Sequence, residues 1–254
     1  AGFWSARGGS APTIFHEAPS PYGIPYGSLR AGDVDNLLLA GRCHSATHMA
    51  HSSTRVMGTC MSMGQAAGTA AALACRLGSD PAGVTGHIAE LQQMLLRDDC
   101  YLPGARREVP EATRAARLEA SAGDAEPIRD GWGRQIGDDP HGWEHGPGDA
   151  VTLWLDRPRR VREVELVLDS AMDREISMTH LNRRRSPWEL PPPLPRAFRL
   201  EGRAGGTWQP LHEQTENHRR HVRIAVGRDL QAVRYVLDAT RGAPRSRLYA
   251  LYVA

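Results

Sequence analysis

The stretch VDNLLLAGRCHSATH, residues 34–48, decides the fold of the first part of the chain. Its apolar run over residues 37–41 contains no charged residue and ends at Gly41. A short apolar run closed by glycine is typical of a strand buried on both faces. Such strands belong to α/β cores. We therefore predict a buried strand over residues 37–41 and an α/β fold around it.

Helices are expected on the C-terminal side of this strand. A loop rich in His, Ser and Thr leads to residues 59–77, which we predict to be a helix with Thr59 as its N-cap. Its many glycines and alanines let the backbone approach a sheet or a ligand closely, although each glycine costs about 1 kcal/mol of helix stability. A second helix is predicted over residues 81–98. The proline-rich residues 1–30 form an extended connector.

From about residue 114 the apolar residues alternate with a period of two, which predicts strands. Turns rich in Gly, Pro and Asp separate these segments, and no helical pattern lies between them. An all-β antiparallel sandwich is the architecture expected from such a pattern. We place the α/β fragment at residues 1–105 and the sandwich at residues 106–254. The predicted strands cover residues 151–155, 161–168, 197–200, 221–226 and 233–237.

The composition of the 254 residues excludes several classes of protein. The formal net charge is +2, and all basic residues are Arg, a bias typical of a GC-rich bacterial genome. These arginines are dispersed among acids, so we expect no nucleic-acid partner. No apolar stretch reaches the roughly 20 residues of a membrane span, and the N-terminus lacks a signal-peptide pattern. The four cysteines show no CxxC spacing, which favours free thiols in a reducing, cytoplasmic compartment.

Residues 34–48, together with STRVMGTCMSMGQAAG at 53–68 and the approach at 22–26, carry a family resemblance. Over residues 20–100 the chain resembles the FAD-dependent oxidoreductases with a glutathione-reductase-like flavin fold. The resemblance implies FAD as the cofactor and transfer of a hydride or an electron pair to or from a small organic substrate. A tightly packed strand–helix unit without a ligand is the alternative for the strand and helix pattern alone.

The resemblance also implies which residues contact FAD. The end of the strand is expected beside the ribityl and pyrophosphate groups. The helix start is expected to direct its free amides at N1 and the C2 carbonyl of the isoalloxazine ring. Many related flavoproteins have Asp where this chain has Arg42, so Arg42 is expected to face phosphate oxygens instead. The implied cofactor-binding residues are Ala40, Gly41, Arg42, Arg55, Val56, Met57, Gly58 and Thr59.

Three histidines, His44, His48 and His51, follow the strand at spacings of four and three. On one helix face they could hold a catalytic zinc, which would make the chain a hydrolase. We favour instead a proton donor or acceptor beside the flavin, with His48 as the first candidate and His44 as the second. A packing or solvent-facing role is the alternative for each histidine. We predict no metal.

The second half resembles the discoidin-like, galactose-binding-like sandwiches appended to some members of this family. The segments 115–121 and 128–132 near its start carry that resemblance. Trp132, Trp143 and Trp208 could stack on sugar rings, although a sandwich also buries tryptophans in its core. The alternative function is therefore a non-catalytic carbohydrate- or protein-binding module, and a carbohydrate-related substrate fits the main prediction.

No part of the chain supplies the G-x-G-x-x-G turn that receives the FAD pyrophosphate in flavoproteins of this type. We therefore expect the chain to be a C-terminal fragment, one subunit of a split enzyme, or a relic. Its first residue, Ala1, favours truncation. The expected partner is a dinucleotide-binding segment from the same gene or a separate subunit, and this chain alone is expected to be inactive.

Overall fold

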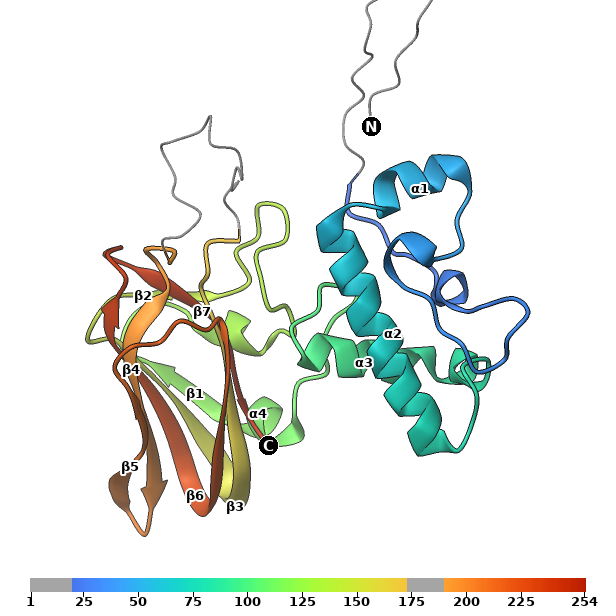
Figure 1. The fold of residues 1–254 in the computed structure, drawn as a ribbon. Helices are drawn as coiled ribbons and strands as arrows, with labels where there is room; N and C mark the ends of the chain where they lie inside the picture. Colours follow the sequence, from blue (N-terminus) through green and yellow to red (C-terminus); the bar gives the residue numbers. More distant parts are fainter. Residues whose placement is uncertain (1–19, 173–189) are drawn as a thin grey trace, which may run out of the picture. The chain divides into compact units, whose positions relative to one another are not determined.

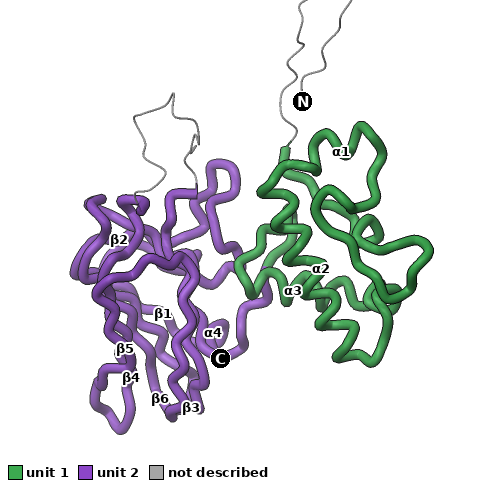
Figure 2. Tube along the Cα trace, in the orientation of Figure 1, with its two compact units in different colours: residues 1–106 green, residues 107–254 purple. Residues whose placement is uncertain are grey.

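The computed structural model describes residues 20–172 and 190–254. The chain divides into two compact units, residues 1–106 and 107–254, drawn in different colours in Figure 2. Each unit is described by itself. Within the described residues, no helix combines the length and the apolar character needed to cross a membrane.

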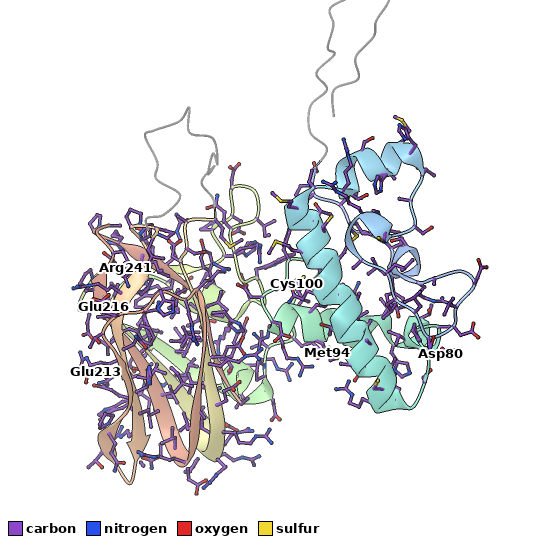
Figure 3. The ribbon with its side chains drawn as sticks, in the orientation of Figure 1. Asp80, Met94, Cys100, Glu213, Glu216 and Arg241 are labelled. Carbon is purple, nitrogen blue, oxygen red and sulfur yellow. The ribbon has the colours of Figure 1, made fainter. Side chains whose placement is uncertain are left out.

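The first unit is helical and is held together by a small aliphatic core. Helix α2 (Met57–Leu77) is followed by Gly78, whose φ of 62° is left-handed and whose N–H donates to the carbonyls of Ala74 and Cys75. Its buried face packs against α3, and Met94 and Cys100, labelled in Figure 3, belong to the same core. The elements in Figure 1 are η1 (Tyr26–Leu29), η2 (Gly41–Cys43), α1 (His48–Thr54), α2 (Met57–Leu77), η3 (Gly83–His87) and α3 (Ile88–Arg97).

Three local predictions for this unit are wrong. Residues 37–41 form no strand: Leu38 makes an isolated antiparallel bridge with Arg30, and Leu37 is exposed. A buried strand needs neighbours along both edges, and the described residues provide one partner at one point. The predicted helix over residues 81–98 is a 3₁₀ turn followed by α3, because Gly83 and Gly86 lie in its first part. Helix α2 also begins two residues before the predicted Thr59.

The second unit is an antiparallel β-sandwich, as the alternating pattern predicts. Its path through the sheet is β2-β7-β3-β6-β4-β5, with β1 beside β3, and every pairing is antiparallel. The strands are β1 (Arg117–Ala120), β2 (Trp143–His145), β3 (Ala150–Leu168), β4 (Pro195–Ala204), β5 (Thr207–Gln214), β6 (His221–Thr240) and β7 (Ser246–Val253). Two short helices accompany them, α4 (Glu111–Ala115) and η4 (Glu126–Arg129).

The two long strands, β3 and β6, pair with each other along most of their length and lie side by side in Figure 1. Their register shifts between Trp154 and Arg159, and such a bulge bends the paired strands. The first half of β3 pairs with β1, and its second half pairs with β7. Leu153 from the first half and Leu166 from the second half join one core cluster. The segments predicted as separate strands on either side of these bulges are therefore parts of single strands.

Candidate functional site

The turn at Gly41 packs against the first turn of α2. Gly41 has a φ of 66°, in the left-handed region that favours glycine. A Cβ atom at this position would lie 3.8 Å from Cys60 Cβ and 3.9 Å from Cys60 Sγ. The Ser45 N–H donates to the Ser28 carbonyl at 2.8 Å and holds the segment after the turn. The strand end predicted to pass the flavin is thus a turn fixed beside the start of a helix.

His44 joins this turn to the C-terminal end of α1. Only 6% of the residue is exposed. Its Nδ1 lies 2.6 Å from the Gly41 carbonyl oxygen, and its Nε2 lies 2.9 Å from Thr54 Oγ1. The ring also stacks on His51, with 5.4 Å between the centroids. Both ring nitrogens are therefore engaged inside the protein.

Helix α2 begins without a side-chain cap. Val56 is the N-cap residue, has an extended backbone and makes no cap hydrogen bond. The first bond of the helix runs from the Cys60 N–H to the Val56 carbonyl at 2.9 Å. The amides of Met57, Gly58 and Thr59 consequently have no acceptor within the helix, and they carry the positive end of its dipole. This geometry suits an electron-rich acceptor group.

Two arginines stand beside this helix start. Arg42 follows the Gly41 turn, Arg55 directly precedes Val56, and both residues are exposed. A cation next to the positive end of a helix dipole is electrostatically unfavourable. An anionic group bound here would relieve that repulsion and could accept a charge-assisted hydrogen bond from a guanidinium group. The site therefore favours an anionic ligand.

Apolar surface surrounds the helix start. Met49, Val56 and Met57 are each more than half exposed. Along the same helix, an open face is formed by Gly58, Met61, Gly64 and Gly68: Met61 is 76% exposed, and a Cβ added at each of these glycines would meet no atom within 4 Å. Contiguous exposed apolar surface of this kind marks a binding surface. The described residues leave the open face of α2 uncovered.

The three histidines do not share one helix face, as the zinc alternative would require. Helix α1 begins at His48, and His44 lies before it. His48 is exposed, His51 is half-buried and His44 is buried. Within residues 20–172 and 190–254, no group of three His, Cys, Asp or Glu side chains could hold a metal ion.

The residues at this site fit the part of FAD that the sequence resemblance implies. Gly41 presents backbone without a side chain, and the three α2 amides and two arginines are all donors. The ribityl, pyrophosphate and ring carbonyl groups of FAD are rich in acceptors. The individual roles predicted for Ala40, Arg42, Arg55 and the α2 residues stay predictions.

Sequence reasoning missed Thr54. Its side chain is buried, and its Oγ1 is the partner of His44 Nε2. Its carbonyl accepts a weak bond from Cys60 Sγ at 3.8 Å. No periodic pattern signals such a contact, because it joins a turn, a helix end and a helix start across two bends in the chain.

A small cleft of about 140 Å³ lies on the sandwich, at the hairpin of β4 and β5. The ladder shifts its register there between Leu200 and Glu201. The guanidinium of Arg234 lies 3.8 Å from the centre of the Trp208 indole. The lining residues are Arg199, Leu200, Glu201, Trp208, Gln209, Pro210, His212 and Glu213, of which Glu213 is labelled in Figure 3.

The three tryptophans singled out in the sequence differ in their surroundings. Trp143 is buried and its indole N–H donates to the Ala122 carbonyl at 2.7 Å, so it belongs to the core. Trp132 and Trp208 are half-buried. Trp208 is the one that lines the cleft.

Residues 5–95 match the sequence profile of the family described as FAD dependent oxidoreductase. This match confirms the resemblance predicted from residues 20–100. The chain thus joins a segment that matches the profile of that family to an antiparallel β-sandwich. No curated protein matches the chain significantly.

Solved structures similar to the chain include three carbohydrate-binding modules. The family 32 module of Streptococcus pneumoniae EndoD has 16% identity and a TM-score of 0.42, and the match covers 56% of this chain and 97% of that module. Chitosan-binding module 1 of a Paenibacillus sp. IK-5 chitosanase/glucanase has 15% identity, a TM-score of 0.39 and coverages of 55% and 95%. The family 32 module of C. perfringens NanJ, solved with galactose, has 10% identity, a TM-score of 0.40 and coverages of 56% and 95%.

Proposed function

We propose that residues 20–100 supply the C-terminal half of the flavin site of an FAD-dependent oxidoreductase. The observation that carries this proposal is the coincidence of the family match with the uncapped start of α2. The match covers the Gly41 turn, and the turn packs on that helix start. Donors from both elements therefore belong to one site.

Different residues of the proposed site bind different parts of FAD. The backbone at Ala40 and Gly41 binds the ribityl chain, and Arg42 binds phosphate oxygens. The first amides of α2 would hold the electron-rich edge of the isoalloxazine ring, and Arg55 would place a positive charge beside it. When bound, FAD supplies hydride or electron-pair transfer to or from a small organic substrate.

Proton exchange in this site is assigned to His48. Its side chain is exposed at the first position of α1. An imidazole is suited to move a proton near neutral pH. His44 is the weaker candidate for this step, because only 6% of the residue is exposed.

The partner of this half-site is a dinucleotide-binding segment carrying the G-x-G-x-x-G turn. It covers the open face of α2, where three glycines allow a backbone to approach closely. That contact buries Met61 and encloses the ring. Without the segment, the adenosine end of FAD lacks the residues that bind it in flavoproteins of this type, and we expect the affinity for FAD to be low.

Co-expression tests this proposal. The chain alone should purify without flavin absorbance. Co-expressed with a segment that carries the G-x-G-x-x-G strand–turn–helix, it should purify as a yellow complex with the spectrum of bound oxidised flavin. A segment whose three glycines are replaced by Ala is the matched control and should give no colour. Tight FAD binding by the chain alone, or a colourless native complex, would contradict the proposal.

A second candidate function belongs to the sandwich. The cleft at the β4–β5 hairpin combines the indole of Trp208 with the charged Arg199 and Glu213 and the amide of Gln209. An aromatic ring packs on the apolar face of a sugar ring, and charged and amide groups bind its hydroxyls. The volume of about 140 Å³ suits one small polar ring. We therefore propose a carbohydrate as the ligand of this cleft.

A glycan array with the full chain tests the second candidate. Trp208→Ala should abolish binding of any glycan that the chain retains. Trp132→Ala removes a half-buried indole that does not line the cleft, and it should leave binding intact. If Trp132→Ala loses glycan binding and Trp208→Ala retains it, the cleft is not the binding site.

A further inference from the structure

A closed circuit of side-chain and backbone contacts joins three segments of the first unit. His44 Nδ1 contacts the Gly41 carbonyl, and His44 Nε2 contacts Thr54 Oγ1. The Thr54 carbonyl accepts from Cys60 Sγ, and Cys60 in turn packs against Gly41. The Gly41 turn, the end of α1 and the first turn of α2 are thereby fixed to one another.

The protons in this circuit can be assigned from the acceptors. A carbonyl oxygen has no proton to donate, so His44 Nδ1 must carry one to bond to Gly41. If His44 is neutral, its Nε2 accepts the proton of the Thr54 hydroxyl. If His44 is charged, Nε2 donates to Thr54, whose own proton then goes to the Ala50 carbonyl, 3.1 Å away. Both nitrogens are satisfied in either state.

We infer that His44 is a positioning residue: it holds the Gly41 turn against the start of α2, so that the turn and the α2 amides face the flavin together. This inference rests on the proposed flavin site and deepens it. His44 acts through the Gly41 carbonyl and Thr54 and does not touch the flavin. Two groups of His44 bond to the Gly41 carbonyl: the backbone N–H at 3.3 Å and the ring Nδ1 at the shorter distance of 2.6 Å. The ring bond is the one that also connects the turn to Thr54.

The tautomer of His44 can be measured by NMR in the chain without flavin. In its neutral form, His44 should be the Nδ1–H tautomer, which is the less common one for imidazole in water. Its ¹⁵N shifts should therefore show a protonated Nδ1 and an unprotonated Nε2 at alkaline pH. The opposite tautomer would overturn the inference.

Substitutions of His44 can distinguish a positioning role, which needs its hydrogen bond to Gly41, from a packing role, which does not. The amide nitrogen of Asn can replace Nδ1, so His44→Asn can still donate to Gly41, whereas His44→Leu cannot. We expect His44→Leu to speed hydrogen exchange of the Ser45 amide by about tenfold and His44→Asn to restore most of its protection. His87→Leu, at an exposed histidine of the same unit, is the matched control. Thr54→Val provides a second test if His44→Leu does not fold, and it should show a smaller increase.

The same variants are then assayed in the complex completed by the dinucleotide-binding segment. Affinity for FAD should fall about tenfold or more with His44→Leu and recover with His44→Asn. Equal behaviour of the Leu and Asn variants, or exchange and affinity equal to those of His87→Leu, would overturn the positioning role. If the unchanged complex binds no FAD, the proposed flavin site fails, and the exchange data alone still decide whether His44 positions the turn.

Discussion

The two units bury their apolar surface to different extents. The sandwich has a large core with fully buried aromatic side chains, including Trp143, Phe198 and Tyr235. The first unit has a small aliphatic core around Leu73 and Leu91, and it contains most of the large apolar side chains that are exposed among the described residues. A sandwich closes its own core. The exposed apolar surface of the first unit is the surface that the proposed dinucleotide-binding segment would cover.

The largest loss of stability is expected when a side chain in the sandwich core is truncated. Phe198 is fully buried, and Phe198→Ala should lower the free energy of unfolding of the sandwich by about 3–5 kcal/mol. Denaturant unfolding monitored by β-type circular dichroism measures this change. Arg196→Ala, on the same strand and exposed, should change it by less than about 0.5 kcal/mol. A small effect of the Phe198 change would mean that the sandwich core is not closely packed.

The sandwich should also lose stability in mild acid. Burial lowers the pKa of His145 to about 4, against 6.5 for an exposed histidine. Between these values the unfolded chain binds a proton that the folded chain does not, so stability falls as the pH is lowered from 6.5 to 4. The full loss is about 3 kcal/mol, since one pKa unit corresponds to about 1.4 kcal/mol. Denaturant unfolding at a series of pH values measures it.

Glu165 titrates in a lower pH range, so the stability loss caused by His145 can be distinguished from general acid unfolding. Burial would raise the pKa of Glu165, but hydrogen bonds from Arg107 and His221 outweigh it and hold the pKa at about 2. The stability that Glu165 contributes is therefore lost between pH 4.5 and 2, below the window of His145. His145→Phe should remove the loss between pH 6.5 and 4. An unchanged slope in that variant would assign the loss to another group.

The smallest effect on stability is expected on the uncovered surface of the first unit. Met57→Ser combined with Met61→Ser should reduce self-association of the full chain, because both side chains are exposed beside the α2 start. Stability should change by less than about 0.5 kcal/mol. Sedimentation velocity measures the association, and Leu190→Ser, at an exposed apolar residue of the second unit, is the control. Equal self-association of the unchanged chain, the double variant and Leu190→Ser would mean that the exposed apolar side chains of α2 do not cause association.

The sequence predicts the sandwich well because its layers are amphipathic. Residues 197–200 alternate in burial and lie within β4. Strand β7 escaped prediction because seven of its eight residues are buried, so no alternation marks it. β1 and β2 are too short to show a period, and Pro210 interrupts the pattern of β5.

In the first unit the pattern predicts the long helix and fails at the strand. Residues 59–77 carry a helical composition whatever surrounds them, whereas residues 37–41 need strand partners that the described chain supplies only at Leu38. The circuit through His44 and Thr54 depends on tertiary contacts and could not be predicted from periodicity. The candidate site was predicted as a set of residues, and the way that they are held together was not.

The most direct test of the central claim is an FAD titration of the complex completed by the dinucleotide-binding segment. Among the described residues, a Cβ at Gly58 would meet no atom within 4 Å outside the backbone of its own helix. Gly58→Val should therefore leave the chain folded and act only on a ligand at the helix start. Gly58→Val should weaken FAD binding about tenfold or more, and Arg55→Ala should do so by about 1.5–3 kcal/mol through loss of a charge-assisted hydrogen bond. Gly32→Val and Arg76→Ala, away from the helix start, should bind as the unchanged complex does. Equal affinity of all four variants would contradict the claim that the α2 start is half of a flavin site.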